Sequence, residues 1–203
     1  PFHFIWSIIM KKNRHPYSSK VKKDNRISHL DKSTIWIIEV TILAFTMSLV
    51  LSFFSEAVIS NATTVVSVIV LVVFIFLGIL FDMIGVAVTV ADAKVFNSMA
   101  AKKVRGSKTA LHMIKNNARV SSFCNDVIGD ICGILSGGAG VTIAVSLSSL
   151  ISINPIIVNL TVTSLIAAFT IGGKAIGKSF AINKANKILY RFSKTIDILT
   201  FTK

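Results

Sequence analysis

The chain has 203 residues, of which 53% are apolar and only 15% charged, and its mean hydropathy is +0.73. No ordinary water-soluble domain needs so much apolar mass for its core, so the excess is expected to face lipid. The net charge of +13 would favour nucleic acid as a partner on a soluble domain, but long uncharged runs interrupt it here and argue against that partner.

The chain divides into a basic arm, four apolar segments and a basic tail. Residues 1–33 are the expected cytoplasmic N-terminal arm. Each apolar segment reaches the ~20 residues that a helix needs to cross the hydrocarbon core of a bilayer. We therefore predict an all-α integral membrane protein with four transmembrane helices. Within a few residues, these are expected at 35–55, 64–90, 121–149 and 155–173.

The distribution of positive charge predicts the orientation. All 22 Lys and Arg fall between Lys11 and Lys32, between Lys94 and Arg119, or between Lys174 and Lys203. Because cytoplasmic loops carry the excess of Lys and Arg, both termini and the central loop are expected in the cytoplasm of a multi-pass cell-membrane protein. The predicted domains are the arm at 1–33, a transmembrane domain at 34–177 with a basic loop at 92–119, and a basic C-terminal helix at 178–203.

The central loop and the tail each show apolar residues near helical spacing with Lys and Arg between them. This pattern is typical of short helices that lie on the inner membrane surface. They are expected to touch anionic lipid, with a regulatory role as the alternative. The apolar positions are Val104, Ala110 or Leu111, Ile114 and Val120 in the loop, and Ile182, Ala185, Ile188 and Leu189 in the tail.

Two apolar spans contain carboxylates. Asp82 and Asp92 fall on the second span and Asp126 and Asp130 on the third. A carboxylate at the centre of a membrane helix costs ~2.5–3.5 kcal/mol on insertion scales, so such residues are expected to face a partner, a cavity or an ion. Asp82 and Asp92 share one helical face with Gly85 and Thr89, but they lie ~15 Å apart and cannot share one ion.

The third span offers hard oxygen ligands. Asp126 and Asp130 are neighbours on one helical face, and Asn125 adds an amide oxygen beside them. Such oxygens suit Mg²⁺ or Ca²⁺, and the imidazole or thiolate cluster that zinc would favour is missing. The alternative is that these carboxylates lie at the cytoplasmic interface and cap helices or pair with Lys and Arg.

The same span carries small residues. Gly129, Gly133 and Gly137 form a ridge that lets another helix approach closely, in the bundle or across a homodimer. Cys124 and Cys132 fit neither a disulfide framework nor a zinc ribbon and are interpreted as packing residues, with a metal or redox role as the alternative. No arrangement of catalytic residues appears in the sequence, which predicts that the protein is not an enzyme.

From about Gly78 to Gly173 the chain resembles the membrane domain of the CorB/CorC and cyclin-M family of magnesium-transport proteins. The matching features are a Thr89-Val-Ala-Asp92 sequence where the family has Ser-x-x-Glu, a basic segment with Gly106, and the stretch ARVSSFCNDVIGD, which is similar to a family stretch containing Gly-Asn-Asn. The resemblance implies Mg²⁺ as the transported or bound ion, without another cofactor. The positions that would correspond to ion-binding ones are Thr89, Asp92, Asn125, Asp126 and Asp130.

The resemblance also implies dimers packed through the membrane domain, which the ridge of Gly129, Gly133 and Gly137 would suit. The chain departs from the family in an extra first span, in the register of Asn125-Asp126, and in the expected lack of cytosolic nucleotide-sensing domains. The leading hypothesis is a membrane protein that moves or senses Mg²⁺ or a similar divalent cation. The alternative is a non-transporting adaptor that binds anionic lipid or a partner protein through its basic segments.

Overall fold

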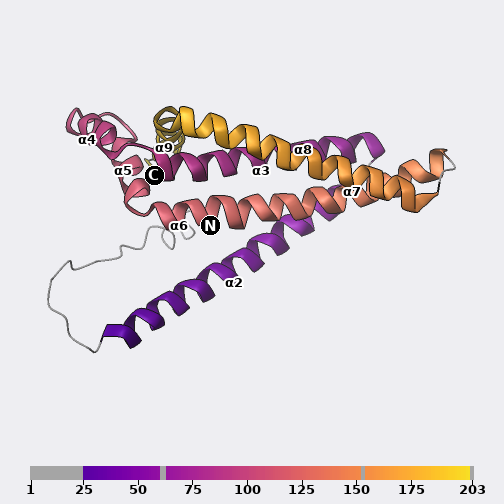
Figure 1. Ribbon diagram of the computed structural model, residues 1–203, viewed down its shortest axis with the longest axis horizontal. Helices are drawn as coiled ribbons and strands as arrows, with labels where there is room; N and C mark the ends of the chain where they lie inside the picture. Colours follow the sequence, from indigo (N-terminus) through magenta and orange to yellow (C-terminus); the bar gives the residue numbers. More distant parts are fainter. Residues whose placement is uncertain (1–24, 60–62, 152–153, 202–203) are drawn as a thin grey trace.

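The computed structural model describes residues 25–59, 63–151 and 154–201, and within these ranges all regular structure is helical (Figure 1). Residues 1–24 of the predicted N-terminal arm lie outside the described residues. Four helical spans are long and apolar enough to cross a membrane. The predicted all-α fold with four transmembrane helices is confirmed, and the protein is a multi-pass membrane protein. The spans are Thr34–Ala57, Thr64–Val90, Asn117–Ile151 and Pro155–Asn183.

The third span changes its helix type along its length. It begins as α6 (Asn117–Ser122), passes through the π-helix η1 (Phe123–Ile128) and continues as α7 (Gly129–Ile151). A π-helix bonds each N–H to a carbonyl five residues back, which widens the helix, and such turns are frequent at functional sites. This segment contains Asn125 and Asp126, two of the residues that the sequence singles out.

Three helices form the centre of the bundle. They are α3 (Thr64–Val90), α7 and α8 (Pro155–Asn183), and each packs along the other two. Small residues allow the close approach: a Cβ on Gly140 of α7 would overlap Ile166 of α8, and a Cβ on Gly78 would lie 3.3 Å from Cβ of Cys132. Van der Waals contact between closely spaced backbones therefore holds this three-helix unit together.

The remaining long helix, α2 (Asn25–Ile59), is attached more loosely. Its Val40, Ala44 and Met47 pack against a small cluster on η1 and α7. The end of α2 drawn in indigo stands apart from the other helices (Figure 1). Most of its apolar side chains are exposed, as expected for a helix surrounded mainly by lipid.

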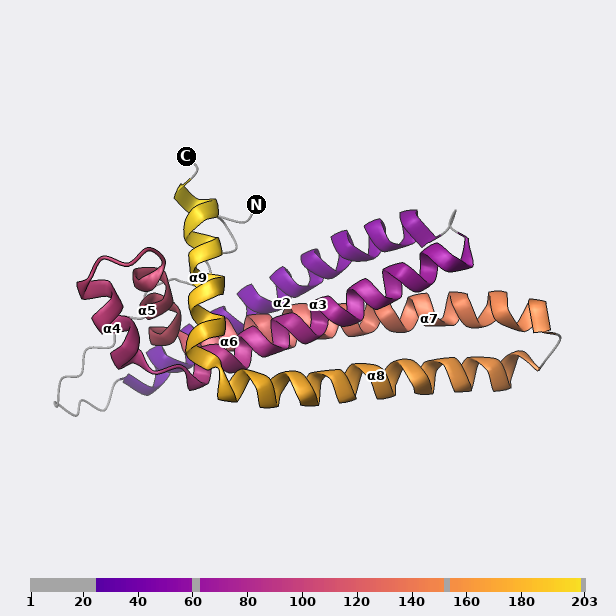
Figure 2. The same ribbon diagram turned by 90° about the horizontal axis from the view of Figure 1, so that it is seen from above.

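Four helices gather at one end of the bundle, and we call them the cap. They are α4 (Ala93–Ala101), α5 (Ser107–Lys115), α6 and α9 (Ala185–Phe201), and α9 runs across the bundle rather than along it (Figure 2). Their apolar faces meet the end of α3 in one core. The fully buried side chains of this core include Phe96, Ala110, Met113 and Leu189.

The cap differs from the surface helices that the sequence predicts. Ala110 and Val120 of the loop and Leu189 of the tail are buried in one core, so these three positions pack on protein. The predicted C-terminal segment 178–203 is also divided. In the structure α8 continues to Asn183, Lys184 alone separates it from α9, and α9 begins at Ala185.

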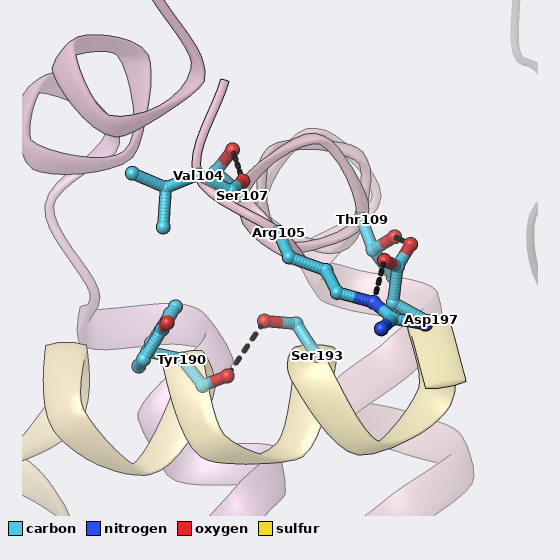
Figure 3. Close-up of polar contacts among 7 residues, drawn as sticks. All are labelled: Val104, Arg105, Ser107, Thr109, Tyr190, Ser193 and Asp197. Carbon is cyan, nitrogen blue, oxygen red and sulfur yellow. Dashed lines mark hydrogen bonds and ion pairs between the residues drawn. The ribbon is translucent and has the colours of Figure 1, made fainter. Parts of the chain in front are cut away.

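Polar contacts fix α9 to α5 and to the turn that precedes it (Figure 3). Asp197 of α9 accepts a hydrogen bond from Oγ1 of Thr109 at 3.2 Å and lies 3.5 Å from Nε of Arg105. Gly106 in the same turn has a φ of 83°, a left-handed conformation that glycine adopts without strain. The turn and α9 thereby form one polar junction at the edge of the cap.

Replacing Gly106 with alanine should destabilise the cap by ~1–3 kcal/mol, because the left-handed backbone would be strained. In addition, the new Cβ would lie 2.9 Å from backbone atoms of Lys194, which cannot turn away as a side chain can. Limited trypsin digestion of the purified protein should show faster cleavage within the cap. Gly138→Ala is the control, since its added Cβ would meet no described atom within 4 Å beyond its own turn of the helix; equal cleavage of both variants would contradict the prediction.

Candidate functional site

Asp82 lies on α3 toward the cap end of the bundle, and its side chain is almost fully enclosed. The residue is only 3% exposed, and its Oδ2 has no hydrogen-bond partner in the part of the chain that the structure describes. Nζ of Lys178 on α8 lies 3.7 Å from Oδ2. A buried carboxylate is costly unless it is paired, so the attraction of Lys178 offsets part of that cost.

A second buried oxygen lies on the facing π-helix. Oδ1 of Asn125 is enclosed and has no hydrogen-bond partner among the described residues. Its amide rests on Gly85 of α3, where a Cβ would overlap both Oδ1 and the carbon that bears it. Gly85 is three residues after Asp82, ~4.5 Å farther along the same face of α3. The missing side chain at Gly85 therefore makes the space that the amide of Asn125 occupies.

We call Asp82, Gly85, Asn125 and Lys178 the polar cluster. It brings a carboxylate and an amide oxygen, both buried and both lacking a hydrogen bond within the described ranges, to neighbouring turns of one helix face. Native proteins satisfy most buried polar atoms, so two such oxygens, one on α3 and one packed against the next turn of α3, call for a ligand or water. Carboxylate and amide oxygens are hard ligands of the kind that Mg²⁺ and similar cations prefer.

The predicted site residues on the second span lie outside the polar cluster. Thr89 is exposed and donates a hydrogen bond to the carbonyl oxygen of Val86 at 2.8 Å. Asp92 is exposed and caps α4, because its Oδ1 accepts a hydrogen bond from the backbone N–H of Lys94 at 2.8 Å. Its own backbone N–H donates to Oδ1 of Asn186 at 2.9 Å, which links the start of α4 to α9.

The predicted carboxylates of the third span are also exposed. Oδ2 of Asp126 accepts a hydrogen bond from the hydroxyl of Ser122 at 2.5 Å. The side chain of Asp130 is 69% exposed and lies 4.0 Å from Nζ of Lys174. Of the five predicted site residues, only Asn125 belongs to the polar cluster. The described residues contain no group of three or more His, Cys, Asp and Glu placed to hold a metal ion together.

The lysines of α8 are the functional candidates that sequence reasoning missed. Lys174 and Lys178 are four residues apart, hence neighbours on the helix surface, and each lies close to a carboxylate of another helix. Their spacing of four residues could have indicated a shared helical face. The sequence instead placed them at the end of the membrane span and in the cytoplasmic tail. The structure places both beside the carboxylates of the bundle.

The two cysteines and the glycine ridge have separate surroundings. Cys124 and Cys132 are free and buried, Cys124 in the cap core and Cys132 against Gly78. An added Cβ at Gly133 or Gly137 would meet no described atom within 4 Å. Those two positions are not used in packing among the described helices, and the homodimer through the ridge stays a prediction.

The resemblance to magnesium-transport proteins rests on the sequence motifs alone. The membership of the chain in that family therefore stays a prediction. Comparison of the chain with protein-family models, with curated proteins and with solved structures found no match.

Proposed function

We propose that the protein is a CorB/CorC-like component of the cell membrane that moves Mg²⁺ or a similar divalent cation, with the polar cluster as its cation site. The observation that carries the proposal is the pair of buried oxygens, Oδ2 of Asp82 and Oδ1 of Asn125, that lack hydrogen bonds among the described residues. A carboxylate within a membrane span is energetically costly and therefore rare, and such residues often mark ion pathways.

The chemistry of the site is partial dehydration of the cation. A divalent ion that reaches the cap end of the bundle would exchange some of its water for the carboxylate of Asp82 and the amide of Asn125. Mg²⁺ gives up its water reluctantly and is usually bound through one or two carboxylates, which suits a site with a single Asp. Weak, incomplete coordination also lets the ion leave again, as transport requires.

Cation flux into proteoliposomes that contain the purified protein tests the proposal. Asp82→Asn keeps the size of the side chain but removes its charge, and it should reduce Mg²⁺ flux to the level of empty liposomes. Glu56→Gln, which makes the same chemical change at an exposed position of α2, should leave flux unchanged. Full flux in Asp82→Asn would exclude the polar cluster, and the Asp126→Asn, Asp130→Asn double variant would then test the exposed carboxylates of the third span.

The second candidate function is an adaptor that binds anionic lipid. Lys187, Arg191 and Lys194 are exposed along one face of α9. A pocket of about 340 Å³ lies where α3 ends and α8 meets α9, and Lys184 and Lys187 contribute to its lining. Positive groups at this position suit the phosphates of inner-leaflet lipids. An absence of flux above empty liposomes for the wild-type protein would favour this function.

A further inference from the structure

The ion pair between Asp82 and Lys178 joins a buried carboxylate to a half-exposed ammonium group. The side chain of Asp82 is 5% exposed, whereas that of Lys178 is 50% exposed. Asp82 is enclosed within the bundle, but the long side chain of Lys178 is able to extend toward water near the cap end of α8. One partner of the pair is therefore fixed, and the other is able to leave.

The pair is close enough for charge neutralisation but too long for a hydrogen bond. Nζ of Lys178 lies 3.7 Å from Oδ2 of Asp82, beyond the ~2.7–3.2 Å of an N–H···O hydrogen bond. That oxygen accepts no hydrogen bond from the other described residues either. Oδ2 consequently keeps its capacity to bind a better ligand than the ammonium group.

Helix packing places the ammonium group at the carboxylate. Beside the pair, a Cβ on Gly177 would lie 2.8 Å from Cγ of Met83, so α8 approaches α3 very closely at this level. Gly177 precedes Lys178 and Met83 follows Asp82 in the chain. The close approach of the two backbones thus brings the lysine within reach of the buried carboxylate.

We infer that Lys178 is a built-in competitor of the transported cation, an inference that rests on the proposed function. Its ammonium group holds the place beside Asp82 and is displaced when a divalent cation binds there. The ammonium group and a divalent cation repel each other strongly in a poorly solvated site with one carboxylate, so both cannot occupy it. Lys178 thereby lowers the affinity of the site for the cation and neutralises Asp82 when the cation has left.

Lys174 provides a matched comparison one helical turn away. Nζ of Lys174 lies 4.0 Å from Oδ1 of Asp130, but that carboxylate is 69% exposed, so the bundle does not enclose it as it encloses Asp82. The inference therefore applies to Lys178 and does not extend to Lys174. A comparison of variants at these two lysines separates the effect of a buried ion pair from the effect of positive charge on α8 in general.

Titration of the purified full-length protein with MgCl₂ in detergent, followed by calorimetry, tests the inference. Lys178→Gln should bind Mg²⁺ roughly ten-fold more tightly than the wild type, because the competing charge is gone. Lys174→Gln should bind Mg²⁺ as the wild type does. The double variant Asp82→Asn, Lys178→Gln should lose binding, which would show that the gain in affinity acts through Asp82.

A second measurement needs no variant at Lys178 and so does not depend on the folding of one. Amine-directed acetylation of the wild-type protein, read by mass spectrometry, should modify Lys178 faster in saturating MgCl₂ than in NaCl of equal ionic strength. The rate at Lys174 should stay the same in both salts. The displaced ammonium group would be more accessible to the reagent, whereas a purely structural lysine would not respond to the cation.

The outcomes separate this inference from the proposed function. Failure of the wild-type protein and of Lys178→Gln to bind Mg²⁺ would overturn both. Binding by the wild type that Lys178→Gln leaves unchanged, or an acetylation rate at Lys178 that Mg²⁺ does not alter, would overturn the competitor role alone. Tighter binding in Lys178→Gln together with faster acetylation in the wild type supports it.

Discussion

Replacing Gly85 with alanine is expected to lower Mg²⁺ flux by ~10–100-fold, the usual cost of disturbing a group that orients a ligand of a metal ion. The added Cβ would overlap the end of the Asn125 side chain, which can turn away at little cost because it is short and flexible. The amide oxygen would then no longer lie on the same face of α3 as Asp82. The measurement is flux into proteoliposomes.

The matched control is Gly172→Ala on α8, where the added Cβ would meet no atom of another helix within 4 Å among the described residues. Both variants make the same change within an apolar helix, so the comparison isolates the position of the Asn125 amide. Thermal unfolding in detergent should be similar for the two proteins. Equal flux in both variants would mean that the amide of Asn125 has no part in the cation site.

Replacing Phe96 with alanine is expected to destabilise the cap by ~3–5 kcal/mol, the cost of removing a fully buried phenyl ring. Phe96 on α4 is 0% exposed and packs in the core that joins α4, α5 and α9 to the end of α3. Hydrogen exchange should therefore become at least ~100-fold faster at amides of α5 and α9, since each ~1.4 kcal/mol changes an equilibrium ten-fold. Amides within α7 should keep their rates.

Phe45→Ala on α2 controls for the chemical change alone. Its ring is 68% exposed, so little packing is lost when it is removed. Hydrogen exchange in the cap of this variant should equal that of the wild type. A similar increase in both variants would contradict the conclusion that the cap has a core of its own.

The membrane spans could be predicted from the sequence because apolar length alone determines them. The second span was expected at 64–90 and is found at Thr64–Val90. The fourth was expected to end at 173, where Lys174 interrupts the apolar run, yet α8 continues to Asn183. Lysine is a good helix former, and Lys174 and Lys178 each lie near a carboxylate, so the charge ends the apolar run without ending the helix.

The cap could not be predicted, because an apolar stripe does not reveal what covers it. Ala110 and Leu189 sit at helical spacing among basic residues, a pattern that serves a membrane surface and a protein core equally well. Which of the two applies depends on contacts between α5 and α9, which lie far apart in the chain. Periodicity within one helix contains no information about such contacts.

The candidate site was predictable only in part for a similar reason. The sequence drew attention to Asp82 and Asn125 because polar groups are rare in apolar spans. It could not show that Asn125 rests on Gly85, or that Lys178 reaches Asp82, since both contacts join different helices. The carboxylates that spacing brought together, Asp126 and Asp130, are exposed in the fold. Spacing along one helix therefore did not show which of these polar groups the fold encloses.

The single residue between α8 and α9 couples the movements of the two helices. Lys178 lies on α8 within the bundle. Asp197 lies on α9 across the cap, where it contacts Arg105. Because Lys184 alone connects the two helices, no flexible loop can absorb a tilt of α8. Such a tilt must shift α9 and the turn that contains Arg105. The exposed face of the cap would thus move whenever α8 moves within the bundle.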